Sequence, residues 1–336
     1  MYQYGIIGFG GLGRKHLNNL LQIGAERKDI QLTAICGTTE EQARKTISIN
    51  LGTVDVSQVD FSKCHFYADY HEMLDHEKLD FVFSVLPTDL HEDVALYALS
   101  KGIHVFSEKP MALTLEGCDR MVAAAQKSQK YLMVGQCLRF HPAYRKLKAF
   151  IDSGCYGRVR NACFERYSQT PLWTWNNWIL DSKKSGGCVL DMHVHDVDLI
   201  NWFFGVPDRL RSIVTDGKYL AESVDTTYWY PEFRVSAKAD WSLPQTYPFT
   251  ARCRVDFEKA SVLIQNDTIY VHTNEESTCE TVDSEMCFVQ EIEAFLVAVI
   301  DNVPCEATSA LSVRDTVRIV MAEIHSSVHG NCVCGL

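Results

Sequence analysis

The eight residues from Asp191 to Asp198, DMHVHDVD, contain three aspartates and two histidines. Side chains of these types can bind a metal, exchange protons as acid and base, or complement the positive end of a helix dipole. Apolar residues recur at helical spacing around them, so the sequence predicts a helix over residues 188–203. The positions of the polar side chains around that helix decide among the three kinds of chemistry.

At about 100° per residue, Asp191, His195 and Asp198 fall within one narrow arc of the helix. Asp191 and His195 are neighbours at i and i+4, with Cβ atoms about 5–6 Å apart. His193 projects to the opposite side and receives no role, and Asp196 lies off the arc. A catalytic zinc ion usually has three ligands rich in histidine or cysteine, so these groups fit a metal poorly and none is predicted. The sequence favours a catalytic acid–base pair of Asp191 and His195 over a metal site or a purely structural helix start, with Asp198 as a supporting partner.

A lysine stands in the segment Ser107-Glu108-Lys109-Pro110, directly after a short apolar strand predicted from Ile103 to Ser107. At the carboxyl end of a strand in a doubly wound sheet, a side chain points into the ligand crevice. A cation there can polarise a substrate hydroxyl or carbonyl oxygen. Lys109 is therefore a candidate catalytic and ligand-binding residue, although an isolated Lys-Pro is also common at the surface before a turn.

The segment Gly8-Phe9-Gly10-Gly11-Leu12-Gly13 has the pattern G-x-G-x-x-G. It follows a predicted strand, Tyr4 to Gly8, and opens a predicted helix from Leu12 to Ile23, which is the context that a dinucleotide-binding fingerprint requires. Gly8 permits the tight turn, Gly10 lets the backbone approach a pyrophosphate, and Gly13 lets the helix pack on the strand. Gly8, Gly10, Gly11, Leu12 and Gly13 are therefore predicted to bind NAD(H) or NADP(H).

The second predicted strand, Gln31 to Cys36, is followed by Gly37, Thr38 and Thr39. Sites that select NAD usually have an acidic residue here, which binds the ribose 2′-hydroxyl. Without an acid a 2′-phosphate is not repelled, and without an arginine it is not clearly attracted. Gly37, Thr38 and Thr39 are predicted cofactor contacts, and the choice between NAD and NADP stays open. Thr38 and Glu41 have the spacing of a capping box for the next helix.

The order of the predicted elements indicates two domains. Short apolar strands alternate with helices in the first part of the chain, which predicts a doubly wound parallel sheet of the Rossmann type in residues 1–128. Long alternating stretches from Arg158 to His272 and two final helices predict an α+β domain with a large antiparallel sheet in residues 129–336. The last helix is also compatible with packing back on the first domain.

Charge and composition limit the partners. With 32 Lys and Arg against 43 Asp and Glu, the net charge of -11 argues against nucleic acid and against anionic membranes. The sequence has no membrane-spanning run and no signal peptide, so a cytoplasmic location is expected. The thirteen cysteines have scattered spacing, which favours free thiols over a disulfide framework.

Together the motifs resemble the Gfo/Idh/MocA family of oxidoreductases. They occur in the family's order as GFGGLG at 8–13, LPTDLH at 86–91, EKPMALT at 108–114, GQCLRFHPAYRKLKAFIDSG at 135–154 and GGCVLDMHVHDVDLINWFFG at 186–205. The resemblance implies a Rossmann domain, an α+β domain with an open, mostly antiparallel sheet, and homo-oligomers, dimers or tetramers, packed through that sheet. It also implies a catalytic lysine before a cis-proline, here Lys109 and Pro110, and an aspartate–histidine pair, here Asp191 and His195. Gly37 departs from the acid common in NAD-using members, and His193 from the glycine or cysteine of many members.

Further residues are predicted to line the site. Leu86, Pro87, His91 and Glu108 lie in motifs that the resemblance places beside the cofactor. Aromatic rings can stack on the C–H faces of sugars, and amides can form hydrogen bonds with hydroxyl groups. These properties suggest substrate contacts in a tryptophan-rich loop. A packed loop or an oligomer contact is an equally open interpretation of the same residues. The predicted substrate contacts outside Lys109, Asp191 and His195 are Gln136, Arg166, Trp173, Trp175 and Asn176.

These observations predict an NAD(P)-dependent dehydrogenase that oxidises a secondary hydroxyl of a sugar, glycoside or inositol, or reduces the matching ketone. One alternative is an enzyme that holds its cofactor tightly and uses transient oxidation for glycoside cleavage or epimerisation. Another is a non-catalytic nucleotide-binding sensor. The sequence leaves open the substrate, the carbon oxidised, the net direction and the oligomer size.

Overall fold

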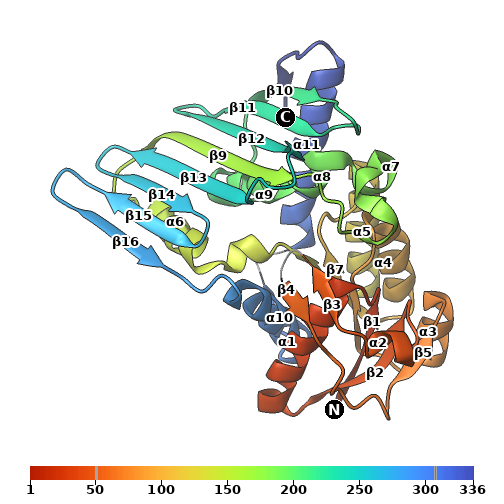
Figure 1. Ribbon diagram of the computed structural model, residues 1–336. Helices are drawn as coiled ribbons and strands as arrows, with labels where there is room; N and C mark the ends of the chain where they lie inside the picture. Colours follow the sequence, from red (N-terminus) through yellow and green to blue (C-terminus); the bar gives the residue numbers. More distant parts are fainter. Residues whose placement is uncertain (50–51, 306, 308) are drawn as a thin grey trace. The chain divides into compact units, whose positions relative to one another are not determined.

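The computed structural model describes residues 1–49, 52–305, 307 and 309–336, and these form two compact units (Figure 1). The first unit comprises Met1–Ala112, Glu116–Gly135 and Phe288–Leu311, and the second comprises Leu113–Leu115, Gln136–Cys287 and Ser312–Leu336. The division into domains 1–128 and 129–336 and the packing of the last helix stay predictions. No helix in the described part of the chain is long and apolar enough to cross a membrane.

The first unit contains a six-stranded parallel sheet in the order β5-β2-β1-β6-β7-β8. Its strands are β1 (Tyr2–Ile7), β2 (Ile30–Cys36), β5 (His65–Tyr67), β6 (Phe81–Ser84), β7 (His104–Glu108) and β8 (Leu132–Gly135). The chain runs outward from β1 in one direction and then returns to β6 to run in the other. The carboxyl ends of β1 and β6 therefore flank the point where ligands bind in doubly wound sheets.

Helices connect these strands, as parallel pairing requires. They are α1 (Gly11–Arg27), α2 (Glu40–Ala43), α3 (Tyr70–His76), α4 (His91–Ser100) and α5 (Leu115–Ser128), with a short 3-10 turn η1 (Thr88–Leu90) and a small hairpin of β3 (Ile47–Ile49) and β4 (Gly52–Val54). A later helix, α10 (Met286–Ile300), packs on the same sheet without connecting its strands. On one face of the sheet, Phe83 and Phe106 contact both His16 of α1 and Phe295 of α10. All residues of β6 and β8 are buried, which explains why both strands are apolar apart from Ser84 at the end of β6.

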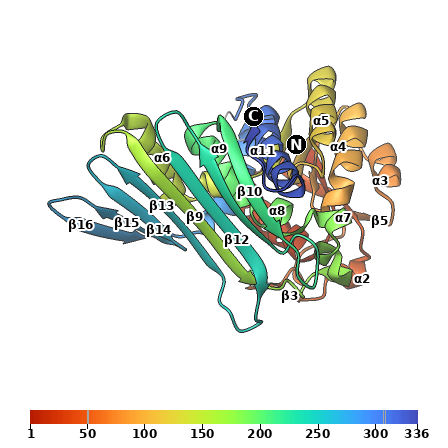
Figure 2. The ribbon, with the colours of Figure 1, turned by 90° about the horizontal axis from the view of Figure 1, so that it is seen from above.

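The second unit contains a nine-stranded sheet in the order β16-β15-β14-β13-β9-β12-β11-β10-β17 (Figure 2). Its strands are β9 (Val159–Gln169), β10 (Arg209–Thr215), β11 (Ser223–Trp229), β12 (Arg234–Leu243), β13 (Thr250–Phe257), β14 (Ser261–Gln265), β15 (Thr268–His272), β16 (Ser277–Thr281) and β17 (Cys334–Gly335). Every pair is antiparallel except β9 with β12. The predicted fold class, a Rossmann-type sheet plus an open, mostly antiparallel sheet, is confirmed.

Helices pack on one face of this second sheet. They are α6 (Pro142–Ser153), α7 (Ser182–Ser185), α8 (Gly187–Asp191), α9 (Val194–Phe204) and α11 (Ala310–Val328), with 3-10 turns η2 (Cys137–Phe140) and η3 (Trp175–Leu180). Buried residues alternate with partly or fully exposed ones along β9, β11 and β12, so each strand turns one set of side chains toward the helices. Ser326 of α11 accepts a hydrogen bond from the backbone of Ser212, which fastens this helix to β10.

Two local predictions were wrong. The stretch 188–203 is not one helix, because it breaks at Met192 and His193 between α8 and α9. The cap of α2 is Thr39, whose side chain accepts a hydrogen bond from the Gln42 amide, so Thr38 forms no capping box.

Candidate active site

The glycine loop after β1 is shaped by close backbone approaches. Gly8 has φ of +92°, and a Cβ there would lie 2.1 Å from the carbonyl oxygen of Val85 after β6. A Cβ on Gly13 would lie 2.2 Å from the carbonyl oxygen of Gly8. Gly37, after β2, packs against Gly8, with its ideal Cβ 3.9 Å from the Gly8 Cα atom. The structure thus brings together the predicted cofactor residues that follow β1, β2 and β6.

Gly10 differs from its neighbours because a Cβ at this position would meet nothing within 4 Å. The open space lies at the N-terminus of α1, which has no acidic residue in its first turn and no side-chain cap. Backbone N–H groups and the helix dipole at such a site favour an anion. The residues present therefore fit a dinucleotide, whose pyrophosphate the backbone of Gly10, Gly11 and Leu12 would hold.

This geometry predicts different results for two alanine variants. Gly10→Ala is expected to fold with a normal melting temperature but to bind NAD(H) at least about 10-fold more weakly, because the added methyl group occupies space that the pyrophosphate needs. Gly8→Ala is expected to lower the melting temperature, because its Cβ meets backbone. Thermal unfolding and fluorescence titration with NADH measure the two effects, and tight NADH binding by Gly10→Ala would argue against this placement of the pyrophosphate.

Arg14, which the sequence analysis did not single out, supports the same loop. Its guanidinium group is buried and donates to the carbonyl oxygens of Phe9 and Gly10 on one side and of Gln42 and Ala43 on the other. A buried cation surrounded by carbonyl oxygens fixes the glycine loop against the end of α2. Burial lowers the pKa of Arg14, but an arginine stays protonated.

The end of β2 offers few groups that distinguish NAD from NADP. Gly37 and Thr39 are exposed and Thr38 is half-buried. The Thr38 hydroxyl donates to the carbonyl oxygen of Thr39, and the Thr39 hydroxyl serves as the cap of α2. The predicted contacts of these residues with the cofactor ribose stay predictions.

Lys109 directly follows β7, at the carboxyl edge of the first sheet, and is half-buried. The Lys109–Pro110 peptide bond is cis, as the resemblance implied. His91 links this turn to the loop after β6, because its Nδ1 atom lies 2.7 Å from the Pro110 carbonyl oxygen and its Nε2 atom 2.8 Å from that of Leu86. Burial lowers the pKa of His91. His91 is thus a clamp between two loops, one carrying Lys109 and the other Leu86 and Pro87.

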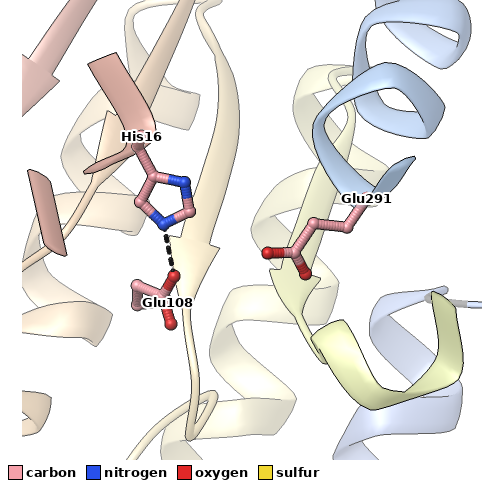
Figure 3. Close-up of side chains that lie close together, drawn as sticks. All are labelled: His16, Glu108 and Glu291. Atoms are coloured by element: carbon pink, nitrogen blue, oxygen red, sulfur yellow. Dashed lines mark hydrogen bonds and ion pairs between the residues drawn. The ribbon is translucent and has the colours of Figure 1, made fainter. Parts of the chain in front are cut away.

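Glu108 belongs to a buried group with His16 of α1 and Glu291 of α10 (Figure 3). The Glu108 carboxylate lies 2.6 Å from His16 Nε2, and it also accepts a hydrogen bond of 3.2 Å from the backbone N–H of Lys109. Burial disfavours the charged form of Glu108 and so raises its pKa. The hydrogen bond and the charge interaction with His16 outweigh burial, and the pKa of Glu108 lies below its usual value. The Glu108–His16 pair thus fixes the backbone of Lys109 through the hydrogen bond from its N–H group.

The ligand atoms of His16, Glu108 and Glu291 lie within 4.8 Å of one another, which is close enough for one cation. However, the contact of 2.6 Å between His16 and Glu108 is a direct hydrogen bond that joins two of the three atoms to each other. Cation ligands at about 2.0–2.2 Å from a metal would stand farther apart than this. His16 and Glu108 therefore form a hydrogen-bonded pair that supports the backbone of Lys109.

In the second unit, the stretch from Asp191 to Asp198 is held by three buried contacts with distant elements. His193 lies 3.3 Å from both Glu323 of α11 and Tyr228 of β11. The other two contacts are bidentate ion pairs, of Asp196 with Arg166 on β9 and of Asp198 with Arg139 in η2.

Every residue of this stretch is buried except Asp191 and His195, which are half-exposed. The structure therefore separates the five polar residues into three that anchor the segment and two that remain partly accessible. The two accessible residues are the predicted acid–base pair. Because the helix breaks between them, their relative position follows from the turn at Met192 and His193 and not from regular i, i+4 geometry.

The other predicted substrate contacts lie in different environments. Trp173, Trp175 and Asn176 are exposed, and Trp175 presents 76% of its surface to solvent. Gln136 is buried, and its Nε2 atom has no hydrogen-bond acceptor among the described residues. Arg166 is buried, and its Nε and Nη2 atoms donate to the two carboxylate oxygens of Asp196, so it also positions the α9 segment. Contacts of these five residues with substrate stay predictions.

Sequence analysis missed His16, Glu291 and Glu323, which all share one signal. Each is a titratable residue on the apolar face of a helix: His16 is followed by Leu20 and Ile23 on α1, and Glu323 follows Thr316 and Val320 on α11. A charged residue on a buried face needs a partner. The signal indicates that a buried polar contact exists, but not with which residue.

Comparisons with known proteins agree with this architecture. The model of the oxidoreductase family with an NAD-binding Rossmann fold matches residues 2–136, and that of the GFO/IDH/MocA C-terminal domain matches residues 144–263. Myo-inositol 2-dehydrogenase of Thermotoga maritima is 28% identical over 285 residues, covering 81% of this chain and 78% of that protein. Inositol 2-dehydrogenase of Salmonella paratyphi B is 26% identical over 199 residues, covering 59% of this chain and 53% of that protein.

Among solved structures, a levoglucosan dehydrogenase in complex with NADH and levoglucosan superimposes with a TM-score of 0.84. It is 16% identical and covers 99% of both chains, so it supports the fold. The two family matches fall on the two sheets described above, one on each. The chain belongs to the Gfo/Idh/MocA family of NAD-binding oxidoreductases.

Proposed function

We propose that this protein is an NAD(P)-dependent dehydrogenase that oxidises a secondary hydroxyl of a sugar, glycoside or inositol, or reduces the matching ketone. The observation that carries the proposal is the separation of polar groups between Asp191 and Asp198, where only Asp191 and His195 escape burial. The similar inositol dehydrogenases support a polyol as the substrate class.

In this proposal the glycine loop and the N-terminus of α1 hold the pyrophosphate, and Gly37, Thr38 and Thr39 lie near the adenosine ribose. A nicotinamide cofactor bound there supplies the hydride acceptor for alcohol oxidation. The absence of an acidic residue from Gly37 to Thr39 leaves room for a 2′-phosphate, so both NAD and NADP belong in the test. The levoglucosan dehydrogenase with this fold was solved with NADH.

His195 acts as the general base in the proposed reaction. It removes the hydroxyl proton of the substrate while hydride leaves the same carbon, and the C–O bond becomes a carbonyl. Asp191 either orients the imidazole or binds a neighbouring substrate hydroxyl. Arg166 and Arg139, through Asp196 and Asp198, support the segment that carries both groups.

Lys109 donates a hydrogen bond to the substrate oxygen and stabilises the negative charge that develops as the proton departs. Its backbone position is fixed by Glu108 and by the clamp of His91 on Pro110. In the reverse direction the same two side chains polarise the ketone oxygen and deliver the proton to it.

The substrate class is consistent with the exposed polar and aromatic groups of the second unit. Trp173 and Trp175 present rings that stack on the C–H face of a sugar, and Asn176 offers an amide for hydroxyl groups. The Nε2 group of the buried Gln136, which has no acceptor among the described residues, is proposed to donate to a substrate oxygen. These four residues are proposed to recognise substrate and to take no part in hydride transfer.

A panel of inositols, sugars and glycosides, incubated with NAD and with NADP, tests the proposal through absorbance at 340 nm. Net NADH or NADPH formation with a polyol is the expected result. Cofactor that stays bound through gel filtration without net turnover would instead support transient oxidation during glycoside cleavage or epimerisation. If no polyol changes the redox state of the cofactor, the protein is a nucleotide-binding sensor and the proposal fails.

A further inference from the structure

The bend between α8 and α9 is formed by the backbone of His193. Its N–H donates to the carbonyl oxygen of Cys188, five residues earlier, with an N···O distance of 2.8 Å. Its own carbonyl oxygen accepts from the N–H groups of Asp196 and Val197, at 2.9 and 3.1 Å. One residue thus ends the first helix with a widened turn and starts the second.

The side chain of His193 is fully buried, with 0% of its surface exposed. Its Nε2 atom lies 3.3 Å from a carboxylate oxygen of Glu323 and 3.3 Å from the hydroxyl of Tyr228, and Tyr228 donates a short hydrogen bond to the same carboxylate oxygen. Since a carboxylate can only accept, His193 Nε2 carries a proton and donates it. Two elements far away in the sequence, β11 and α11, therefore meet at the bend.

The charges around His193, Glu323 and Tyr228 favour the hydrogen bonds that join these three side chains. Burial lowers the pKa of His193, but the charge and hydrogen bond of Glu323 outweigh it, so the pKa of His193 lies above its usual value. Asp196 on α9 adds to this effect and Arg166 on β9 opposes it. Burial and the Glu323 charge raise the pKa of Tyr228 well above its usual value, which keeps its hydroxyl protonated.

We propose that His193 is a positioning residue, which through Glu323 and Tyr228 fixes the bend between α8 and α9 and thereby sets the directions of Asp191 and His195. This inference rests on the proposed role of His195 as base. His193 stands two residues from each member of the pair, so a rotation of its backbone moves both. A displacement of about 1 Å at a reacting group can lower the rate about 10²-fold.

Stability alone does not require a buried polar contact between His193 and Glu323. Buried ion pairs can often be replaced by apolar residues of similar size without loss of stability. Asp196 and Asp198 already fasten α9 to β9 and η2. A third buried polar contact at the bend itself is therefore best explained by the geometry that it imposes on its two neighbours.

Two variants of nearly equal polarity separate the roles. The amide nitrogen of His193→Gln reaches about as far as imidazole Nε2, and so keeps the contact with Glu323. The amide nitrogen of His193→Asn lies near the position of the imidazole Nδ1 atom of His193, and Nδ1 has no hydrogen-bond partner among the described residues. We expect His193→Gln to keep kcat/KM within about 3-fold of the original and His193→Asn to lose about 10²-fold, by the same misplacement argument.

The control is cofactor affinity, because NADH binds to the first unit in the proposed function and its Kd should be equal in both variants. If His193 is only structural, His193→Asn lowers the melting temperature while kcat of the folded protein stays equal in both variants, and the inference is wrong. Should either variant fold poorly, His193→Gln combined with Glu323→Gln replaces the charged pair by two amides. This double variant should recover the melting temperature and keep kcat/KM.

A measurement without turnover keeps this inference distinct from the proposed function. The imidazole Cε1–H signal of His195, assigned by its absence in His195→Gln, should keep its position in His193→Gln and shift or broaden in His193→Asn. If the unmutated protein oxidises no polyol, the proposed function is wrong, but the comparison of the His195 signal between the two His193 variants can still be made. An unchanged His195 signal in His193→Asn would defeat the positioning role.

Discussion

Lys109→Met and His195→Ala are each expected to lower kcat about 10²- to 10⁴-fold. His195→Ala removes the group that takes the hydroxyl proton, and Lys109→Met removes the positive charge that stabilises the oxygen as the proton leaves. Neither change should unfold the protein, because both side chains are partly accessible and neither lies in the apolar core. The loss should appear in kcat, since both interactions strengthen in the transition state.

Matched controls come from residues of the same type on the surface. Lys127→Met on α5 and His329→Ala after α11 remove exposed side chains, and both should leave kcat unchanged. Steady-state kinetics with the best substrate of the polyol panel and saturating cofactor gives the comparison. Near-normal turnover in Lys109→Met or in His195→Ala would remove that residue from the proposed mechanism, whatever its effect on KM.

The glycine loop shows what the sequence can predict well. The constraint on Gly13 comes from the backbone of Gly8, directly after β1, and the apolar strand before the loop and the helix after it are read directly from the sequence. The closing contact of Gly8 with Val85 spans a longer distance in the chain, but it follows from the parallel pairing of β1 with β6. Local pattern and sheet topology together were sufficient there.

The stretch from Asp191 to Asp198 shows where sequence prediction ended. A periodic pattern predicted one helix, and it identified Asp191 and His195 as the pair of interest. The break at His193 could not be predicted, because it depends on Tyr228 and Glu323, which lie 35 and 130 residues away. The roles of Asp196 and Asp198 likewise depend on arginines in other elements. Buried polar partners are selected by the tertiary fold, and periodicity contains no information about them.

Arg139→Met is expected to destabilise the protein by about 3–5 kcal/mol, the usual cost of removing one partner of a buried ion pair. Arg139 and Asp198 are 2% and 1% exposed and form two parallel hydrogen bonds of 2.7 Å. Thr316 donates a third to the same carboxylate, at 2.9 Å. Without the guanidinium the Asp198 carboxylate stays buried, with Thr316 as its remaining side-chain donor among the described residues, and the unpaired charge causes most of the loss.

An exposed pair provides the comparison for this stability prediction. The Nζ atom of Lys146 lies 2.6 Å from Oε2 of Glu280, but the two side chains are 43% and 56% exposed. Lys146→Met should therefore change the free energy of unfolding by less than about 1 kcal/mol. Denaturant unfolding of both variants measures the difference. Arg139→Met combined with Asp198→Leu should recover part of the loss, because it removes the orphaned charge. If Arg139→Met costs no more than Lys146→Met, then Asp198 does not depend on Arg139, and the segment carrying His195 is held by its other contacts.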